Sequence, residues 1–193
     1  MYIQLFRHFE SQANIKGHVC YDYDSELSVT GQNQIHKLKF NRLENYDKII
    51  SSPLKRAVQT ADLVVNKYNL DKYEISDRVK ERVVSSKFSN VSKQTLKSIR
   101  DANNHIYTSL TQDWEGVSDV EQDKEITDRF YKEIAYIEED SKILIFTHAG
   151  FIHAVIKELF GLSHNYFKIR NGTLVELHKQ GSKFVLNQII QLQ

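Results

Sequence analysis

Two histidines, His8 and His148, and two arginines, Arg7 and Arg56, stand at comparable places in the sequence, each shortly after a short apolar run. An arginine side chain offers paired N–H donors that match the oxygens of a phosphoryl group. An imidazole beside such donors can attack phosphorus, because neutral histidine is a nucleophile near neutral pH and the cations stabilise the developing charge. The four residues therefore predict a pocket that binds and transfers a phosphoryl group without a metal.

The apolar runs before these residues are typical of buried β-strands. Residues 2–6 and 48–50 are short and rich in β-branched side chains, and residues 143–146 are continuously apolar, as in a central strand covered on both faces. Helical patterns lie between the runs, which predicts an α/β fold, a three-layer αβα sandwich with a mostly parallel central sheet. Ligands of such sheets bind beyond the carboxyl ends of the strands, so the three segments should converge. Residues 174–177 and 184–190 predict a hairpin that extends the sheet.

One helix start and one helical insert can be predicted in more detail. Ser51, Ser52 and Pro53 are typical of a helix N-terminus, where a serine caps the free backbone N–H groups. Arg56 would then lie in the first turn. Residues 86–137 are polar with helical spacing of their apolar side chains, and we expect them to form a helical insert that caps the site within a single domain of residues 1–193.

Composition excludes several classes of protein. The 193 residues are 40% hydrophobic and 26% charged, as expected of one soluble globular domain. A formal charge of +1 provides no global field for nucleic acid or a membrane surface. The single Cys20 and the absence of a signal-peptide pattern favour the cytoplasm. The spacing of His148 and His153 lacks the glutamate of a zinc-protease helix, so we expect no metal.

Several segments resemble motifs of a known enzyme family. They are Arg7-His8-Phe9-Glu10-Ser11 with Asn14, Leu27-Ser28-Val29-Thr30-Gly31, the segment from Ser51 to Ala61, Val79-Lys80-Glu81-Arg82, Thr147-His148-Ala149-Gly150 and Asn171-Gly172-Thr173-Leu174-Val175. Through these segments the sequence resembles, over residues 2 to about 177, the histidine phosphatase superfamily, which includes the cofactor-dependent phosphoglycerate mutases. The resemblance implies a phosphoglycerate mutase-like fold.

The resemblance also implies roles for individual residues. His8 would be the nucleophile that becomes phosphohistidine, and Glu81 would protonate the leaving alcohol and later activate water. The residues that would hold the phosphoryl oxygens are Arg7, Asn14, Arg56 and His148. On its own, Glu81 could equally be a surface carboxylate between Lys80 and Arg82.

The sequence departs from the family pattern at three positions. Phe9 stands where the family has glycine, Ala149 replaces the first glycine after His148, and Ser85 lies near where a glycine often follows the acidic motif. Phe9 is the most consequential, because a bulky side chain there could narrow the pocket or displace His8.

Three functions remain open at this stage. The resemblance favours a phosphatase over a phosphoglycerate mutase-type phosphotransferase, because the mutases of the family have extra sequence between the Arg56-type helix and the acidic motif, and a longer tail, which help to retain a bisphosphorylated intermediate. This chain is short there, so less of it would exclude water. A catalytically silent phosphate-binding module would follow if Phe9 misplaced His8. We expect a small phosphorylated substrate, no cofactor, and no nucleic-acid or membrane partner; a homodimer is left open. The segment at residues 17–21 has a weak likeness to α-ribazole phosphatases, but phosphosugars and phosphoserine are equally admissible substrates.

Overall fold

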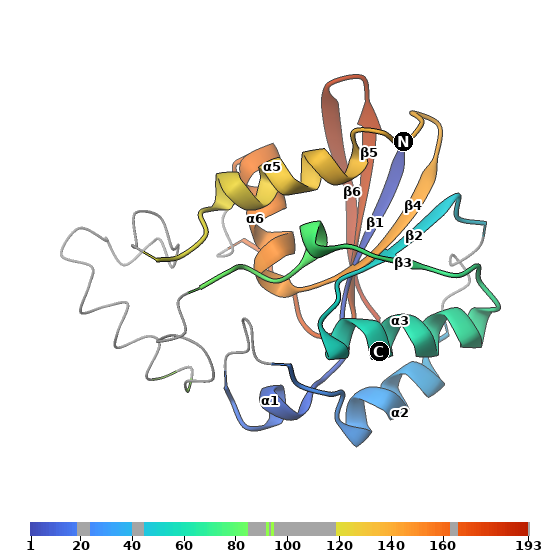
Figure 1. The fold of residues 1–193 in the computed structure, drawn as a ribbon, viewed down its shortest axis with the longest axis vertical. Coiled ribbons are helices and arrows are strands. Elements are labelled where there is room, and N and C mark those ends of the chain that lie inside the picture. Colours follow the sequence, from blue (N-terminus) through green and yellow to red (C-terminus); the bar gives the residue numbers. More distant parts are fainter. Residues whose placement is uncertain are drawn as a thin grey trace.

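A central β-sheet organises the chain. The structure, a computed structural model, describes residues 1–18, 24–39, 45–84, 92, 94, 119–162 and 166–192. In this part of the chain a six-stranded sheet has the order β3-β2-β4-β1-β5-β6 (Figure 1). The strands are β1 (Tyr2–Arg7), β2 (Lys48–Ser51), β3 (Glu74–Ile75), β4 (Lys142–Thr147), β5 (Thr173–Gln180) and β6 (Lys183–Gln191). The first four strands in this order are parallel, and β5 and β6 form the predicted antiparallel hairpin.

Helices cover both faces of the sheet (Figure 1). On one face lie α2 (Val29–Lys37) and α3 (Lys55–Tyr68), and on the other lie α5 (Asp123–Ile134) and α6 (Ala149–Phe160). A short helix α1 (Gln12–Ile15) and a 3-10 turn η1 (Asp77–Val79) lie in connections. The core consists of two hydrophobic clusters, one on each face of the sheet. Leu5 belongs to the cluster beneath α5 and α6, and its neighbour Phe6 belongs to the cluster beneath α2 and α3. Since alternate strand residues point to opposite faces, these two cores confirm the predicted three-layer sandwich.

The carboxyl ends of three strands lie side by side. Arg7 of β1 is the register partner of Thr147 of β4, and Ser51 of β2 is the partner of Phe146 of β4. The loops that follow these strands therefore begin at one edge of the sheet, as the strand-end rule predicted.

The predicted serine cap of α3 is wrong. The helix begins at Lys55, and the N–H of Lys55 donates to Oδ1 of Asp24 at 2.7 Å. The side chain of Ser52 lies 2.7 Å from the ring of His148, and its Oγ also accepts from the N–H of Leu54, the residue before α3, at 3.4 Å. The first N–H of the helix is therefore capped by a segment distant in sequence, while Ser52 joins the helix start to His148.

The predicted insert is described only in its second part. Ile126, Phe130 and Ile134 of α5 are buried and pack against α6 on one face of the sheet. Most of the remaining insert, residues 85–91, 93 and 95–118, lies outside the described residues, as do Cys20 and Ser85. A cap over the site thus stays a prediction. None of the described helices has the length and apolar character needed to cross a bilayer.

Candidate active site

His8 lies just beyond β1 with its ring held between two polar groups. The side chain is buried, and its Nδ1 lies 2.6 Å from the carbonyl oxygen of Phe9. Its Nε2 lies 3.3 Å from Nε of Arg56. A carbonyl oxygen only accepts and an arginine N–H only donates, so the proton belongs on Nδ1 and the lone pair on Nε2. The contacts therefore select the tautomer in which Nε2 can act as a nucleophile.

The two arginines lie beside this ring, Arg56 buried and Arg7 half-buried. Arg56, in the first turn of α3, is 1% exposed. Arg7, at the end of β1, donates through Nη1 to the carbonyl oxygen of Ile169 at 2.6 Å, while its buried Nε has no hydrogen-bond partner among the described residues. Burial lowers the pKa of Arg7 to about 10. The negative charge of Glu81 raises this pKa, and the positive charge of Arg56 lowers it further. Such buried cations carry a free-energy cost that a bound anion would offset.

His148 follows β4 and stands at the start of α6. Its ring centroid lies 5.3 Å from that of His8, and its Nε2 is 2.7 Å from Oγ of Ser52. The buried Nδ1 of His148 has no hydrogen-bond partner within the described part of the chain. The pKa values of both rings lie well below 6.5, mainly because the rings are buried and also because the positive charge of Arg56 disfavours their protonation. Both imidazoles are therefore neutral at neutral pH.

Glu81 brings a carboxylate to the first turn of α6. Its Oε1 accepts from the N–H of Phe151 at 3.1 Å and of Arg82 at 2.9 Å, and its Oε2 accepts from the N–H of Gly150 at 3.3 Å. A Cβ on Gly150 would lie 2.3 Å from Oε1, so only glycine permits this approach. The carboxylate is thus held at a helix N-terminus, where negative charge is stabilised, in the turn that follows His148.

Asn14 lies on α1 beside the same loop. Its Oδ1 accepts from the N–H of Ser11 at 3.1 Å and from Nδ2 of Asn171 at 3.0 Å. These contacts occupy the oxygen, which leaves the Nδ2 group of Asn14 as the one that would donate to a ligand.

Sequence reasoning missed Asn171, Ser52 and Thr60. Nδ2 of Asn171 lies 3.1 Å from the carbonyl oxygens of both His8 and Phe9. Thr60 accepts from the N–H of Phe9 at 3.2 Å. The Asn171-Gly172 turn resembled the family pattern, which was a signal for Asn171. Nothing local in the sequence distinguishes Ser52 from a helix cap or Thr60 from an ordinary helical residue.

Phe9 packs into the core. Its ring is fully buried, meets Phe6 edge to face with ring centroids 5.6 Å apart, and belongs to the cluster on the α2 and α3 side of the sheet. A Cβ on Gly172 would lie 2.6 Å from Cε1 of Phe9, so the bulk at position 9 occupies space that a glycine leaves open. Position 9 also needs no glycine backbone, since its φ is not positive. Ala149, the second departure, begins α6, where alanine is a favourable helix former.

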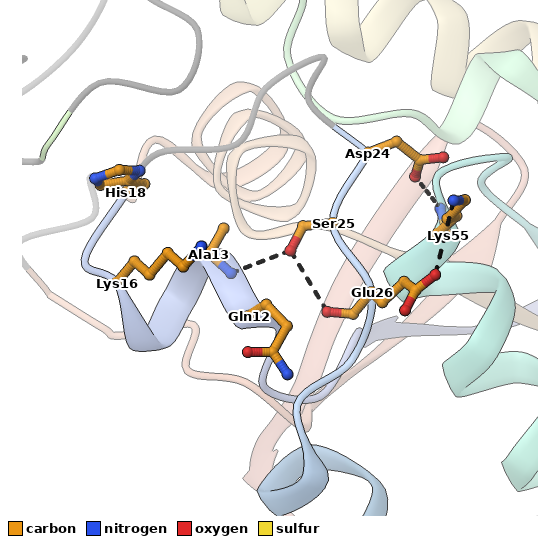
Figure 2. A pocket seen from close by; sticks show the side chains of 8 residues that line it. All are labelled: Gln12, Ala13, Lys16, His18, Asp24, Ser25, Glu26 and Lys55. Carbon is orange, nitrogen blue, oxygen red and sulfur yellow. Dashed lines mark hydrogen bonds and ion pairs between the residues drawn. The ribbon is translucent and has the colours of Figure 1, made fainter.

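A pocket of about 420 Å³ is lined by residues of α1, by residues 24–26 and by Lys55, and none of the proposed phosphate-binding residues lines it. Figure 2 shows α1 on one side of it and Asp24, Glu26 and Lys55 on the other. Glu26 is 3.7 Å from Nζ of Lys55. Charges on this side are thus paired within the protein. Among the described residues no three His, Cys, Asp or Glu side chains gather in a way that could hold a metal ion.

The sheet order and the site at its carboxyl edge define a phosphoglycerate mutase-like α/β fold. The profile of the histidine phosphatase superfamily (branch 1) matches residues 3–191, and the chain belongs to this family. It is 28% identical over 161 residues to the uncharacterized phosphatase PhoE of Bacillus subtilis (strain 168), in a match that covers 81% of this chain and 76% of that protein.

Two solved structures illustrate the shared fold. The α-ribazole phosphatase from Shigella flexneri has a TM-score of 0.74 and 24% identity, over 99% of this chain and 96% of that one. The phosphoglycerate mutase from Thermus thermophilus has a TM-score of 0.69 and 20% identity, over 100% of this chain and 99% of that one. The fold therefore occurs in both hydrolases and mutases.

Proposed function

We propose that this chain is a metal-independent phosphomonoesterase that transfers the phosphoryl group of a small phosphorylated metabolite first to Nε2 of His8 and then to water. Membership of the histidine phosphatase superfamily and the similarity to phosphatases support phosphomonoester hydrolysis. The observation that carries the mechanism is the contact of 2.6 Å between Nδ1 of His8 and the Phe9 carbonyl oxygen, because this acceptor places the proton on Nδ1 and the lone pair on Nε2.

The groups around His8 suit a dianionic phosphoryl group. Nε of Arg7 and Nδ1 of His148 are buried polar atoms without a hydrogen-bond partner among the described residues, and phosphoryl oxygens would satisfy them. Arg56 donates to Nε2 of His8, and a bound phosphoryl oxygen would take over this donor, which exposes the lone pair of Nε2 to phosphorus. The amide of Asn14 supplies a further donor.

The reaction then takes two displacements. Nε2 of His8 forms the bond to phosphorus as the bond to the leaving oxygen breaks, and the carboxyl group of Glu81 gives a proton to that oxygen. The phosphoimidazole keeps its Nδ1–H bonded to the Phe9 carbonyl. Water next attacks phosphorus and gives a proton to the Glu81 carboxylate. The N–P bond breaks, and its electron pair returns to Nε2 of His8.

The silent-module alternative depended on Phe9 displacing His8. The ring of Phe9 lies in the core, while its main-chain carbonyl is the acceptor for His8. This geometry supports a working nucleophile.

The test is hydrolysis of p-nitrophenyl phosphate at mildly acidic pH with EDTA present. We expect turnover in the wild type and in His36→Ala, an exposed histidine of α2, and none in His8→Ala. Acid-labile and base-stable labelling of His8 from radioactive substrate would identify phosphohistidine. Turnover that needs an added metal, or that survives in His8→Ala, would reject the mechanism, and dependence on a bisphosphoglycerate primer would instead indicate a mutase.

A further inference from the structure

One arginine of α5 joins that helix to the segment that carries Glu81. Nε of Arg129 lies 2.7 Å from Oε1 of Glu121, and its Nη2 lies 3.0 Å from Oε2 of the same carboxylate. Nη1 donates to the carbonyl oxygen of Arg78 at 2.6 Å, and Nη2 lies 3.4 Å from the carbonyl oxygen of Glu81. The side chains of Arg129 and Glu121 are 15% and 14% exposed. The guanidinium group thus has a fixed orientation, with the main chain on two sides of it.

The same guanidinium group also touches the helix that binds the Glu81 carboxylate. It lies over the ring of Phe151 at 5.1 Å from the centroid, and the N–H of Phe151 donates to Oε1 of Glu81. Glu121 extends the contact, because its Oε2 accepts from the N–H of Val83 at 2.9 Å. Arg129 and Glu121 therefore contact the main chain on both sides of Glu81 and the residue that its carboxylate binds.

We propose that Arg129, oriented by Glu121, is a positioning residue that fixes the Glu81 carboxyl group over the first turn of α6 for proton transfer to the leaving alcohol. This inference rests on the proposed function, in which Glu81 is the proton donor. A displacement of about 1 Å in a reacting group can cost on the order of a hundredfold in rate. A planar, multiply bonded guanidinium group provides the geometric control that this role requires.

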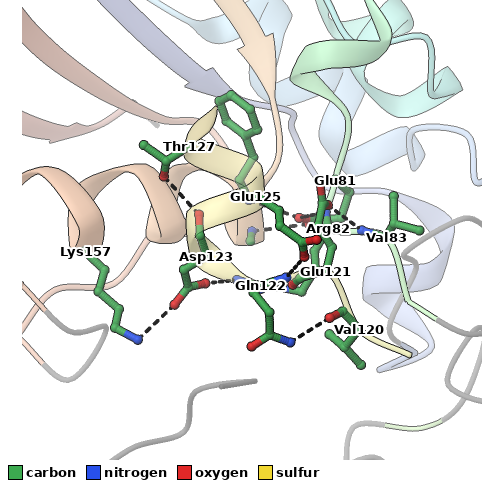
Figure 3. Close-up of polar contacts among 12 residues, drawn as sticks. Glu81, Arg82, Val83, Val120, Glu121, Gln122, Asp123, Glu125, Thr127 and Lys157 are labelled. Carbon is green, nitrogen blue, oxygen red and sulfur yellow. Dashed lines mark hydrogen bonds and ion pairs between the residues drawn. The ribbon is translucent and has the colours of Figure 1, made fainter. Parts of the chain in front are cut away.

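A second anchor keeps the segment attached without Arg129. The buried Arg82 binds Asp123, whose other oxygen accepts from Nζ of Lys157 at 2.9 Å (Figure 3). On the other side, Oγ1 of Thr147 donates to the carbonyl oxygen of Val79 at 2.7 Å. Loss of Arg129 should therefore move Glu81 within a folded protein.

The dependence of the rate on the leaving group distinguishes a role in positioning the proton donor from a general structural role. p-Nitrophenolate leaves without protonation, whereas the alkoxide of glycerol phosphate needs a proton. For Arg129→Gln we expect kcat/KM to fall about 30-fold on glycerol phosphate, within the range of general acid catalysis, and less than about threefold on p-nitrophenyl phosphate. The matched control is Lys124→Gln on the same helix, whose side chain is 76% exposed. It should change neither value.

Burial is the largest cause of the lowered pKa of His148, and the charge of Arg129 adds to it, so this charge must be tested separately. Arg129→Lys keeps the charge but not the planar set of donors. We expect it to show the same selective loss, whereas a preserved kcat/KM in this variant would assign the effect to charge and overturn the proposal. Glu121→Gln, which weakens the orienting pair, should also lose activity selectively on glycerol phosphate.

A double-variant cycle gives the final test. If Arg129 acts through Glu81, then Arg129→Gln made in a Glu81→Gln background should change kcat/KM on glycerol phosphate less than about twofold, because the coupled effect has already been lost. An independent effect of the two variants, or an equal loss on both substrates, would overturn the positioning role. Absence of p-nitrophenyl phosphate hydrolysis by the wild type would instead refute the proposed function.

Discussion

At the scale of the residue, the site concentrates polar groups that are incompletely satisfied by the protein. His8 is buried beside Arg56 and His148, with the half-buried Arg7 next to it in sequence, and two polar atoms of this group have no partner among the described residues. Burial of cations without an anion costs stability, and ligand binding recovers it. The arrangement resembles a site whose electrostatics are set for a bound phosphoryl group before it arrives.

Arg56→Ala should weaken vanadate binding strongly. The variant removes a fully buried cation beside Nε2 of His8, and charge-assisted hydrogen bonds contribute about 1.5–3 kcal/mol each, so we expect the inhibition constant to rise about 10- to 200-fold per lost bond. Inhibition of p-nitrophenyl phosphate hydrolysis measures it. Arg78→Ala, whose side chain is 55% exposed, is the matched control and should leave the constant unchanged. An unchanged constant in Arg56→Ala would contradict the phosphate-binding role.

The ring of His8 should stay neutral where an ordinary histidine takes up a proton. Burial, Arg56 and Arg7 lower its pKa well below 6.5. We expect NMR of the imidazole C–H signals to show no titration of His8 between about pH 7.5 and 5.5, a range that spans the ordinary histidine pKa of about 6.5. A midpoint near 6.5 for His8 would contradict the buried geometry.

The same shift has a consequence for stability. As the pH falls below about 6.5, the unfolded chain binds protons at these positions before the folded chain does, so the free energy of unfolding should decrease. Urea unfolding at several pH values measures this effect. Replacement of His8 and His148 by glutamine should reduce the slope, since both pKa values are lowered in the folded state.

At the scale of the element, Phe9 should be a residue of the core and not of the site. Truncation of a buried phenylalanine costs about 3–5 kcal/mol, so Phe9→Ala should lower the free energy of unfolding by that amount in urea. Its kcat should change little below the unfolding transition, because the main-chain carbonyl still accepts from His8. Val185→Ala, 51% exposed on β6, is the control. A marked loss of kcat in folded Phe9→Ala would place the ring in the site after all.

The sequence predicted those strands that are marked by a pattern of neighbouring residues. The apolar runs predicted β1, β2 and β4, and the strand-end rule brought Arg7, His8 and His148 to one edge of the sheet. It missed β3, which has only two residues, both exposed. Sequence reasoning also interpreted the two serines before α3 only as a helix cap, because capping rules consider neighbours in sequence and the contact of Ser52 with His148 spans 96 residues. The position of Asn171 beside His8 likewise arises from the pairing of β5 with β1.

At the scale of the whole molecule, the two helical layers on opposite faces of the sheet contribute different residues to the site. The layer of α2 and α3 contributes Arg56 and also buries the ring of Phe9, the residue that follows the proposed nucleophile His8. The α5 and α6 side holds Glu81 through the first turn of α6 and through Arg129. The family profile over residues 3–191 includes all of these parts, whereas the substrate alcohol could not be predicted, since no motif specifies its contacts.

Because the site joins both layers, an anion bound there should stabilise the entire fold. A ligand that binds only the folded state adds about 2.7 kcal/mol to the free energy of unfolding at about 100 times its dissociation constant. We expect vanadate at that excess to raise the midpoint of thermal unfolding of the wild type. At the same vanadate concentration Arg56→Ala should gain much less, because its dissociation constant is higher. An equal gain in both proteins would mean that vanadate binds elsewhere, and the convergence of the two layers on one anion site would then be refuted.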